Sequence, residues 1–382
     1  MILTTVEIEK IKDFDEQGFF SSTYLAMDTR LEREVAVKDI NVNGKVKDEE
    51  IEQFFHEALK LSRSEHPRIL PIYFVGFCDT EDNENVIPRV VTKYMKNGTL
   101  SSVLKSHYNT GYTFPLDTII RYAHDIIQSL IHLHSLDILH LDLKASNIFI
   151  GNDGKLVVGD FGQSRFLVDG LTVDAENLYP ALIPDEFTKK GVVDKTADIY
   201  QFGILFYSMC CYDYYRNFLE DDYEIDVEVL KGLFGNPEEK DKDAIKKFGA
   251  NLKRYKQDVK EGLYADGSNY YNYIPGKIIA IIERCVAHKV ENRYNNFYEV
   301  QSDLNELVFP SGVSSYSEEI GQNSIVFKKD DVDCIINYEK NEDSKKYRLV
   351  PRKNIQEVTR KIKEKVTDRT LRKEILKLAD SL

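Results

Sequence analysis

The chain has 382 residues, of which 42% are hydrophobic and 30% charged, so it is long enough for two or three globular domains with a sizeable core. Its net charge of −13 disfavours nucleic acid as a partner, and no apolar run reaches the roughly 18 residues of a transmembrane segment. The five cysteines include no Cys-x-x-Cys pair, and the N-terminus lacks a secretory signal, so we expect a cytoplasmic protein without disulfides or structural zinc.

The first 95 residues are predicted to be mostly β-strands. Residues 34–40 (EVAVKDI) alternate in polarity, and residues 68–77 and 86–95 are rich in β-branched and aromatic residues, which favours strands. Between them, residues 49–63 carry apolar side chains at helical spacing. The pattern indicates a small sheet with one helix packed on it.

Residues 96–308 are predicted to be mostly helical. Asp117 is expected to cap a helix that runs to about Ser135, and helical patterns dominate again from about residue 195. Residues 147–158 (NIFIGNDGKLVV) read as a β-hairpin, whose turn we expect to place Asn147 nearly opposite Val158.

Two further regions differ in character from the rest. Residues 217–243 hold ten acidic residues against three lysines and suggest an insertion, either a solvated excursion or a contact for a partner or basic substrate. Residues 309–382 form a tail with possible strands at 324–329 (SIVFKK) and 333–339 (DCIINYE). Its end carries Ile355, Val358, Ile362 and Val366 at helical spacing. It therefore reads as a basic amphipathic helix that packs on the preceding domain or serves as an interaction or membrane-surface helix.

A lysine and a glutamate are the first candidate functional pair. Lys38 shares a strand face with the small Ala36, while Glu57 lies on the apolar stripe of its helix, where a carboxylate is costly unless it is paired. An ion pair between them would hold the Lys38 ammonium ready for phosphate oxygens. The alternative is an ordinary strand lysine that reaches solvent.

The second candidate cluster lies around the hairpin. Because Asn147 should face Val158, Asp160 should lie close to it, and the two supply hard oxygen ligands suited to Mg²⁺. Asp142 would lie across the site, free to orient an attacking hydroxyl or accept its proton, with Lys144 two residues on. Any one of these residues alone could be an ordinary surface side chain, whereas the set together points to phosphoryl transfer.

Three motifs in this order resemble those of the eukaryotic-type protein kinase family. They are VAVK (35–38), HLDLKASN (140–147) and DFG (160–162), and the resemblance extends from about Ile8 to Val308. Residues 92–95 (TKYM) resemble the gatekeeper and hinge. DIYQFG (198–203) resembles the segment whose aspartate anchors the catalytic loop from below, and ENRY (291–294) resembles a late arginine element.

The resemblance implies an α+β, bilobal protein kinase-like fold that uses ATP and Mg²⁺. A small β-rich N-lobe would span residues 1–95, a larger helical C-lobe 96–308, and a C-terminal extension 309–382. The implied catalytic residues are Asp142, Lys144, Lys38 and Glu57, and the implied metal ligands are Asn147 and Asp160. The implied ATP-binding residues are Gly18, Ala36, Lys38, Thr92, Lys93, Met95 and Phe149. Leu61, Ile72, His140 and Phe161 would stack as a hydrophobic spine through both lobes.

The chain departs from the family pattern at several positions. Only Gly18 remains of the glycine-rich loop, which should weaken ATP binding. Leu141 replaces the arginine that pairs with an activation-loop phosphate, so we expect the loop to be held by packing. Leu178 stands where a threonine is usual, and Asp185 stands where the family has a glutamate that pairs with the arginine at position 293.

Three functions are compatible with these motifs. The first is transfer of the γ-phosphoryl group of ATP to Ser/Thr hydroxyls of protein substrates, for which Lys144 is the serine/threonine-type feature. The second is a pseudokinase, that is, a nucleotide-binding or scaffolding module without turnover. The third is phosphorylation of a small molecule. The oligomeric state is left open.

Overall fold

The computed structural model describes residues 6–14, 21–40, 65–79, 86–111, 113–167, 172–174, 192–211, 270–307, 313–319, 322–354, 356–358 and 361–382. Several sequence predictions lie outside these residues. They concern Gly18, the helix that carries Glu57 and Leu61, Leu178, Asp185, and the acidic segment 217–243.

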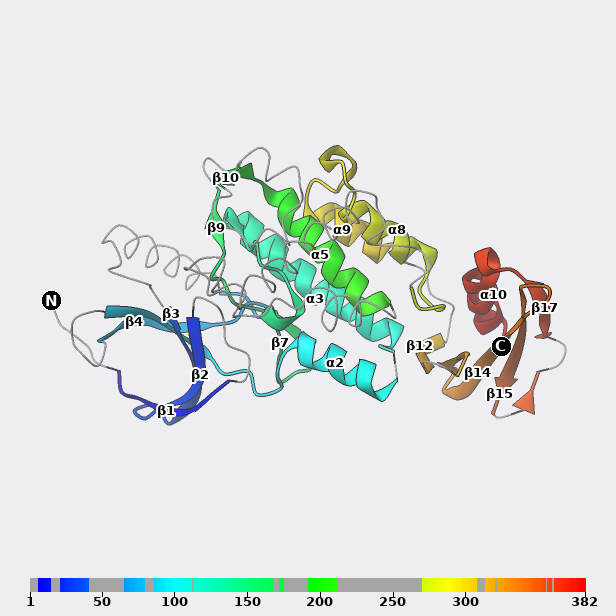
Figure 1. Cartoon of the computed structure of the whole chain (residues 1–382), viewed down its shortest axis with the longest axis horizontal. Coiled ribbons are helices and arrows are strands. Elements are labelled where there is room, and N and C mark those ends of the chain that lie inside the picture. The colour runs from blue at the N-terminus through cyan, green and yellow to red at the C-terminus, as the bar shows by residue number, and fades with distance from the viewer. Residues whose placement is uncertain are drawn as a thin grey trace, which may run out of the picture.

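The N-terminal part is rich in β-strands, as predicted, and forms an antiparallel sheet (Figure 1). The sheet has five strands in the order β1-β2-β3-β5-β4. Val35 and Val37 of β3 are fully buried on one face, in a cluster with Tyr24, Ala26 and Val91. Ala36 and Lys38 therefore lie on the opposite face, as the alternation predicted. The strands are β1 (Ile8–Asp13), β2 (Ser21–Asp28), β3 (Arg33–Ile40), β4 (Ile72–Asp79) and β5 (Val86–Lys93).

The middle part is mainly helical and is organised around a buried central helix, α5 (Lys195–Cys210). The Asp194 carboxylate caps α5 by accepting a hydrogen bond from the Thr196 N–H at 2.8 Å. Every α5 residue from Ala197 to Cys210 is buried, which is typical of a helix packed on all sides. The other helices are α2 (Leu100–Thr110), α3 (Leu116–Ser135), α8 (Gly276–Cys285) and α9 (Phe297–Asn305).

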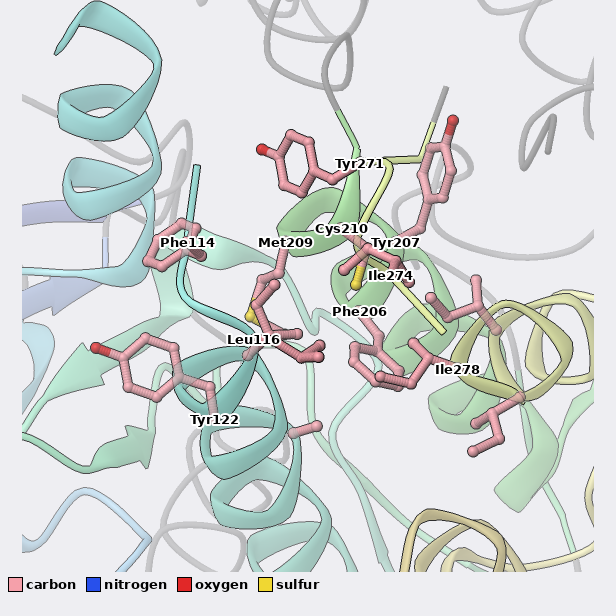
Figure 2. Close-up of a cluster of buried hydrophobic side chains, with 14 of the residues drawn as sticks. Phe114, Leu116, Tyr122, Phe206, Tyr207, Met209, Cys210, Tyr271, Ile274 and Ile278 are labelled. Carbon is pink, nitrogen blue, oxygen red and sulfur yellow. The ribbon is translucent and has the colours of Figure 1, made fainter. Parts of the chain in front are cut away.

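Figure 2 shows the core that α3 and α5 build with residues 271–278. A Cβ atom on Gly203 would lie 2.6 Å from the Cβ of Cys285, so the glycine is what lets α5 and α8 approach this closely. The predicted capping role of Asp117 is wrong, because α3 begins at Leu116 after Pro115. Asp117 lies inside the first turn, where its negative charge still favours the helix dipole.

The predicted hairpin is present, but its register differs by one residue. Strand β7 (Ile148–Ile150) pairs with β8 (Leu156–Val158), and Ile148 rather than Asn147 is opposite Val158. The difference arises in the turn, where the Gly151 N–H bonds to the Lys155 carbonyl at 2.8 Å. The backbone carbonyl of Asn147 instead accepts the Gly159 N–H at 3.0 Å, so Asn147 lies beside the residue that precedes Asp160.

The tail folds as a six-stranded antiparallel sheet with one helix, α10 (Asp368–Ser381). Both predicted strands are confirmed as β13 (Ser324–Lys329) and β14 (Val332–Asn341). The remaining strands are β12 (Val313–Glu319), β15 (Lys346–Lys353), β16 (Gln356–Glu357) and β17 (Lys363–Val366).

The prediction of a helix from Ile355 is wrong, because the helix begins only at Asp368. Val366 is buried in β17, opposite Tyr347 of β15, so the apolar side chain assigned to a helix face completes a sheet instead. A capping box between Thr367 and Thr370 then fixes the start of α10.

The tail packs on the end of the helical part that is remote from the N-terminal sheet (Figure 1). Glu318 of β12 is buried, and its carboxylate accepts hydrogen bonds from the Tyr338 hydroxyl and from the backbone N–H of Asn272 at 3.3 Å. Thr113 exchanges two bonds with the Glu318 backbone, at 2.7 and 3.0 Å, and so covers the outer edge of β12. Within the described part of the chain, no helix is both long and apolar enough to cross a membrane.

We expect Glu318→Ala to lower the free energy of unfolding by about 2–3 kcal/mol, because it leaves the Tyr338 hydroxyl and the Asn272 N–H short of a buried acceptor. Urea denaturation followed by circular dichroism measures the change. Glu339→Ala, at an exposed position of β14, is the matched control. Equal effects of the two substitutions would contradict a stabilising role for Glu318.

Candidate active site

The segment from Ile138 to Leu143 is buried although only its first two residues form a strand, β6 (Ile138–Leu139). Buried backbone N–H groups need partners, and α5 supplies most of them. Asp198 accepts the N–H groups of His140 and Leu141, each at 2.9 Å, and also contacts His134 Nε2 at 2.8 Å. The predicted anchoring of this loop from below is therefore confirmed.

Asp198 stays ionised in this buried position. Burial alone would raise its pKa, but His134 and the N–H donors of the loop outweigh that effect and hold the pKa below its usual value. The carboxylate is thus a permanent acceptor for the loop backbone.

Gln201, one turn further along α5, also binds this loop, and sequence reasoning did not single it out. Its Oε1 accepts the Leu143 N–H at 2.8 Å, and its Nε2 donates to the Leu141 carbonyl at 3.0 Å. The two bonds bracket Asp142. The available signal was its position three residues after Asp198, which places both side chains on one face of the helix.

Asp142, Lys144 and Asn147 come together as predicted. Asp142 Oδ2 accepts a hydrogen bond from Asn147 Nδ2 at 2.8 Å and lies 3.0 Å from Lys144 Nζ. The other oxygen, Oδ1, is buried and has no hydrogen-bond partner among the described residues. Since buried carboxylate oxygens are seldom left unpaired, Oδ1 is an acceptor that still lacks a donor among the described residues.

Asp160 and Lys38 form an ion pair between the hairpin side of the site and the N-terminal sheet. Burial would raise the pKa of Asp160, but Lys38 and then Lys144 outweigh it and hold the pKa below its usual value. The carboxylate therefore stays charged beside a cation. The pairing predicted for Lys38 with Glu57 stays a prediction, because Glu57 lies outside the described residues.

The donor set suits Mg²⁺. Asn147 uses its amide nitrogen on Asp142, which leaves the amide carbonyl oxygen as its ligand atom, and Asp160 adds an ionised carboxylate with 33% exposure. Hard oxygen atoms of these two kinds are the ligands that Mg²⁺ prefers. The ammonium beside Asp160 is direct evidence that this carboxylate favours a cation.

His140 joins the catalytic loop to the segment that carries Asp160. Its Nδ1 accepts the Asp142 N–H at 3.3 Å, so the neutral ring carries its proton on Nε2, which donates to the Gly159 carbonyl at 3.1 Å. The ring also packs on Phe161, with centroids 5.3 Å apart. Phe161 and Ile72 both pack against the main core, while Leu61, the fourth predicted member of the spine, lies outside the described residues.

The predicted adenine-binding residues lie where the sheet meets the helical part. Thr92 and Lys93 end β5, and the Lys93 N–H donates to the Pro71 carbonyl at 3.1 Å. Met95 begins a turn closed by the Gly98 N–H at 3.1 Å, and Gly98 adopts a left-handed φ of 77°. Ala36 of β3 and Phe149 of β7 are both half-buried. Gly18 lies outside the described residues.

Leu141 occupies an apolar cluster in place of the expected arginine. The side chain is fully buried with Leu139, Leu167, Val193 and Ala197. Its backbone has a φ of 62°, which costs a non-glycine residue about 1–2 kcal/mol. Leu167 lies near the start of the activation segment, residues 160–185, and Val193 follows its end, so apolar packing ties the chain at both ends of that segment to the catalytic loop.

The activation segment contains three candidate phosphate acceptors. Ser164 is buried, and its hydroxyl donates to the His140 carbonyl at 3.3 Å, so it is not accessible to a kinase. Thr172 is exposed, beside the short strand pair β10 (Val173–Asp174) and β11 (Val192–Val193). Tyr179 lies outside the described residues.

Lys38 of the sheet contacts Asp160 of the DFG motif, and a buried loop beside them carries Asp142. Protein kinase catalytic domains have this arrangement. Residues 16–303 match the protein kinase domain family. The chain therefore belongs to this family, and its two-lobed α+β architecture is the kinase fold.

Curated relatives are serine/threonine kinases of bacteria and eukaryotes. The chain is 32% identical to the human serine/threonine-protein kinase Nek11 over 199 residues, which is 51% of this chain and 30% of the relative. It is 27% identical to a probable serine/threonine-protein kinase of Clostridium acetobutylicum over 306 residues, 78% of this chain and 39% of the relative. It is 27% identical to the serine/threonine-protein kinase PknB of Mycobacterium leprae over 251 residues, which is 58% of this chain and 39% of the relative. The chain thus spans well under half the length of these relatives.

We expect Leu141→Arg to destabilise the fold by about 3 kcal/mol, because the guanidinium would be buried in an apolar cluster without a partner. Leu141→Met keeps the volume and the apolar contacts, so it should cost less than about 1.5 kcal/mol. Chemical denaturation of both variants checks this. If Leu141→Arg proved as stable as Leu141→Met, the cluster would not be what holds the loop.

Proposed function

We propose that the protein is an ATP-dependent serine/threonine protein kinase that transfers the γ-phosphoryl group to Ser/Thr hydroxyls of protein substrates. The observation that carries this proposal is the Asp142 carboxylate. Asn147 and Lys144 hold one of its oxygens, and the other is buried with no hydrogen-bond partner in the part of the chain that the structure describes. A base fixed in this way is suited to orient a hydroxyl at a single point.

In this mechanism Asp142 Oδ1 accepts the proton of the substrate hydroxyl while the hydroxyl oxygen bonds to the γ-phosphorus and ADP leaves. Lys144, 3.0 Å from Asp142, offsets the negative charge that develops on the transferred group. Its position is the support for the serine/threonine assignment. Bound Mg²⁺ would neutralise the phosphates, with Asn147 and Asp160 as its ligands.

Nucleotide binding is assigned to residues of both lobes. Lys38, oriented by Glu57, would bind the α- and β-phosphates, and the backbone of Lys93 and Met95 would bind adenine. Gly18, Ala36, Thr92 and Phe149 complete the proposed ATP site. The assigned boundaries remain residues 1–95 for the N-lobe, 96–308 for the C-lobe and 309–382 for the extension. We also propose a cytoplasmic location, without nucleic acid as a partner.

The second candidate function is that of a pseudokinase. The observation in its favour is the glycine-rich loop, of which only Gly18 is left. Since Lys144 and Asn147 contact Asp142 and Lys38 pairs with Asp160, we place catalysis first. Transfer of ³²P from labelled ATP to a generic protein substrate, with and without Mg²⁺, separates the two.

Asp142→Asn should lower kcat by about a hundredfold or more, because an amide cannot accept the hydroxyl proton. ATP affinity and the melting temperature should stay near those of the parent. Asp137→Asn is the matched control, since Asp137 is a half-exposed carboxylate in the same region that pairs with Lys195 at 3.2 Å. Near-parental turnover of Asp142→Asn would remove Asp142 from its proposed role.

Activity should not depend on phosphorylation of the activation segment, because an apolar cluster holds the ends of that segment where the family uses an arginine. We therefore expect phosphatase treatment, or Thr172→Ala, to change kcat by less than about threefold. The same labelled-ATP assay measures both. A tenfold or larger loss traced to Thr172 would show that another cation recognises its phosphate.

A further inference from the structure

We propose that Gln201 is a positioning residue that fixes the backbone on both sides of Asp142 and so sets the direction of the open Oδ1 atom. The proposal rests on the function assigned to Asp142 above. It starts from the two Gln201 bonds, to the Leu143 N–H at 2.8 Å and to the Leu141 carbonyl at 3.0 Å. Gln201 is itself fully buried.

Asp198, His140 and Gln201 bind different backbone N–H groups of the loop. Those of His140 and Leu141 bind Asp198, and that of Asp142 binds the His140 ring. The Leu143 N–H is left, and Gln201 takes it. Asp198 therefore fixes the chain before Asp142, whereas Gln201 fixes the chain after it.

The chemistry of the side chain matches this task. The groups on the two sides of Asp142 are a carbonyl at Leu141 and an N–H at Leu143. A side chain that binds both therefore needs a donor and an acceptor. A primary amide has both. An ionised glutamate could only accept, and a methionine fills a similar volume but makes neither bond.

The need for such a clamp follows from the loop itself. Leu141 has a left-handed backbone, a conformation that persists only where its surroundings impose it. Asn147 and Lys144 hold the Asp142 side chain through Oδ2, and Asn147 Nδ2 also donates to the Asp142 backbone carbonyl at 2.8 Å, while neither residue binds Oδ1. The position of Oδ1 therefore depends on the backbone around Asp142, and a shift of about 1 Å there can cost about a hundredfold in rate.

The test compares Gln201→Met and Gln201→Glu with Ser208→Ala, a control at a buried position of the same helix whose hydroxyl bonds within α5, to the Leu205 carbonyl at 2.6 Å. Four quantities are measured for the full chain. They are the exchange rate of the Leu143 amide by NMR, kcat and KM for ATP with a protein substrate, and the melting temperature.

For Gln201→Met we expect Leu143 exchange to rise by about tenfold or more. We expect kcat to fall between about tenfold and a hundredfold, while KM for ATP stays within about twofold. At a pH that ionises its carboxyl group, Gln201→Glu keeps the acceptor for Leu143 but not the donor for Leu141, so its kcat should lie between those of the parent and Gln201→Met. Ser208→Ala should leave all four quantities near those of the parent.

Unchanged Leu143 exchange, or faster exchange with unchanged kcat, would overturn the proposal. A higher KM and a lower melting temperature, with kcat unchanged, would also overturn it. A residue with a merely structural role would give that result. Should Gln201→Met not fold, the kcat of Gln201→Glu at a pH that ionises its carboxyl group decides alone, and a parental value there overturns the proposal. A parent enzyme without any phosphoryl transfer would instead refute the proposed function, and the exchange rate would still decide whether Gln201 fixes this backbone.

Discussion

Burial of the backbone around Asp142 is the constraint on which the site depends. A buried segment without regular secondary structure has to find partners for its polar groups, and here one helix supplies them. Asp198 can do so only as a charged group, and that charge is stabilised by His134 and by the loop it binds. The central helix is therefore both the core of the helical lobe and the base of the catalytic loop, so packing of α5 and geometry at Asp142 are linked.

The same loop connects the site to the rest of the molecule by contacts of a different kind. His140 links the loop to Gly159 and Phe161, the two neighbours of Asp160 in the chain. Asp160 in turn pairs with Lys38 of the sheet. Leu141 links the loop to the two ends of the activation segment through apolar packing. Apolar packing is insensitive to phosphate and to ionic strength, whereas an arginine–phosphate pair would respond to both. This choice of contact suits a site that is assembled as soon as the chain folds.

The sequence predicted the parts of this structure that depend on local pattern. Strand alternation correctly predicted that Lys38 lies on the face opposite Val35 and Val37. The hairpin pattern correctly predicted that Asn147 lies near Asp160. The hairpin register was wrong by one residue because turn hydrogen bonds, not strand pattern, decide it. The start of α10 was wrong because Val366 satisfies a helical spacing and a strand position equally well. Gln201 was missed because its partners lie about sixty residues earlier, beyond any local pattern.

The shared core between the kinase lobes and the tail has a consequence for how the protein comes apart. Tyr316, Ile325 and Phe327 of the tail belong to the same buried cluster as Tyr273 and Ile278 of the helical lobe. The family match ends at residue 303, but the apolar surface does not end there. A fragment cut at that boundary would expose the aromatic side chains that the tail covers, and such a patch promotes aggregation. The lobe and the tail should therefore melt in one transition, and the homology boundary is a poor place to divide the chain.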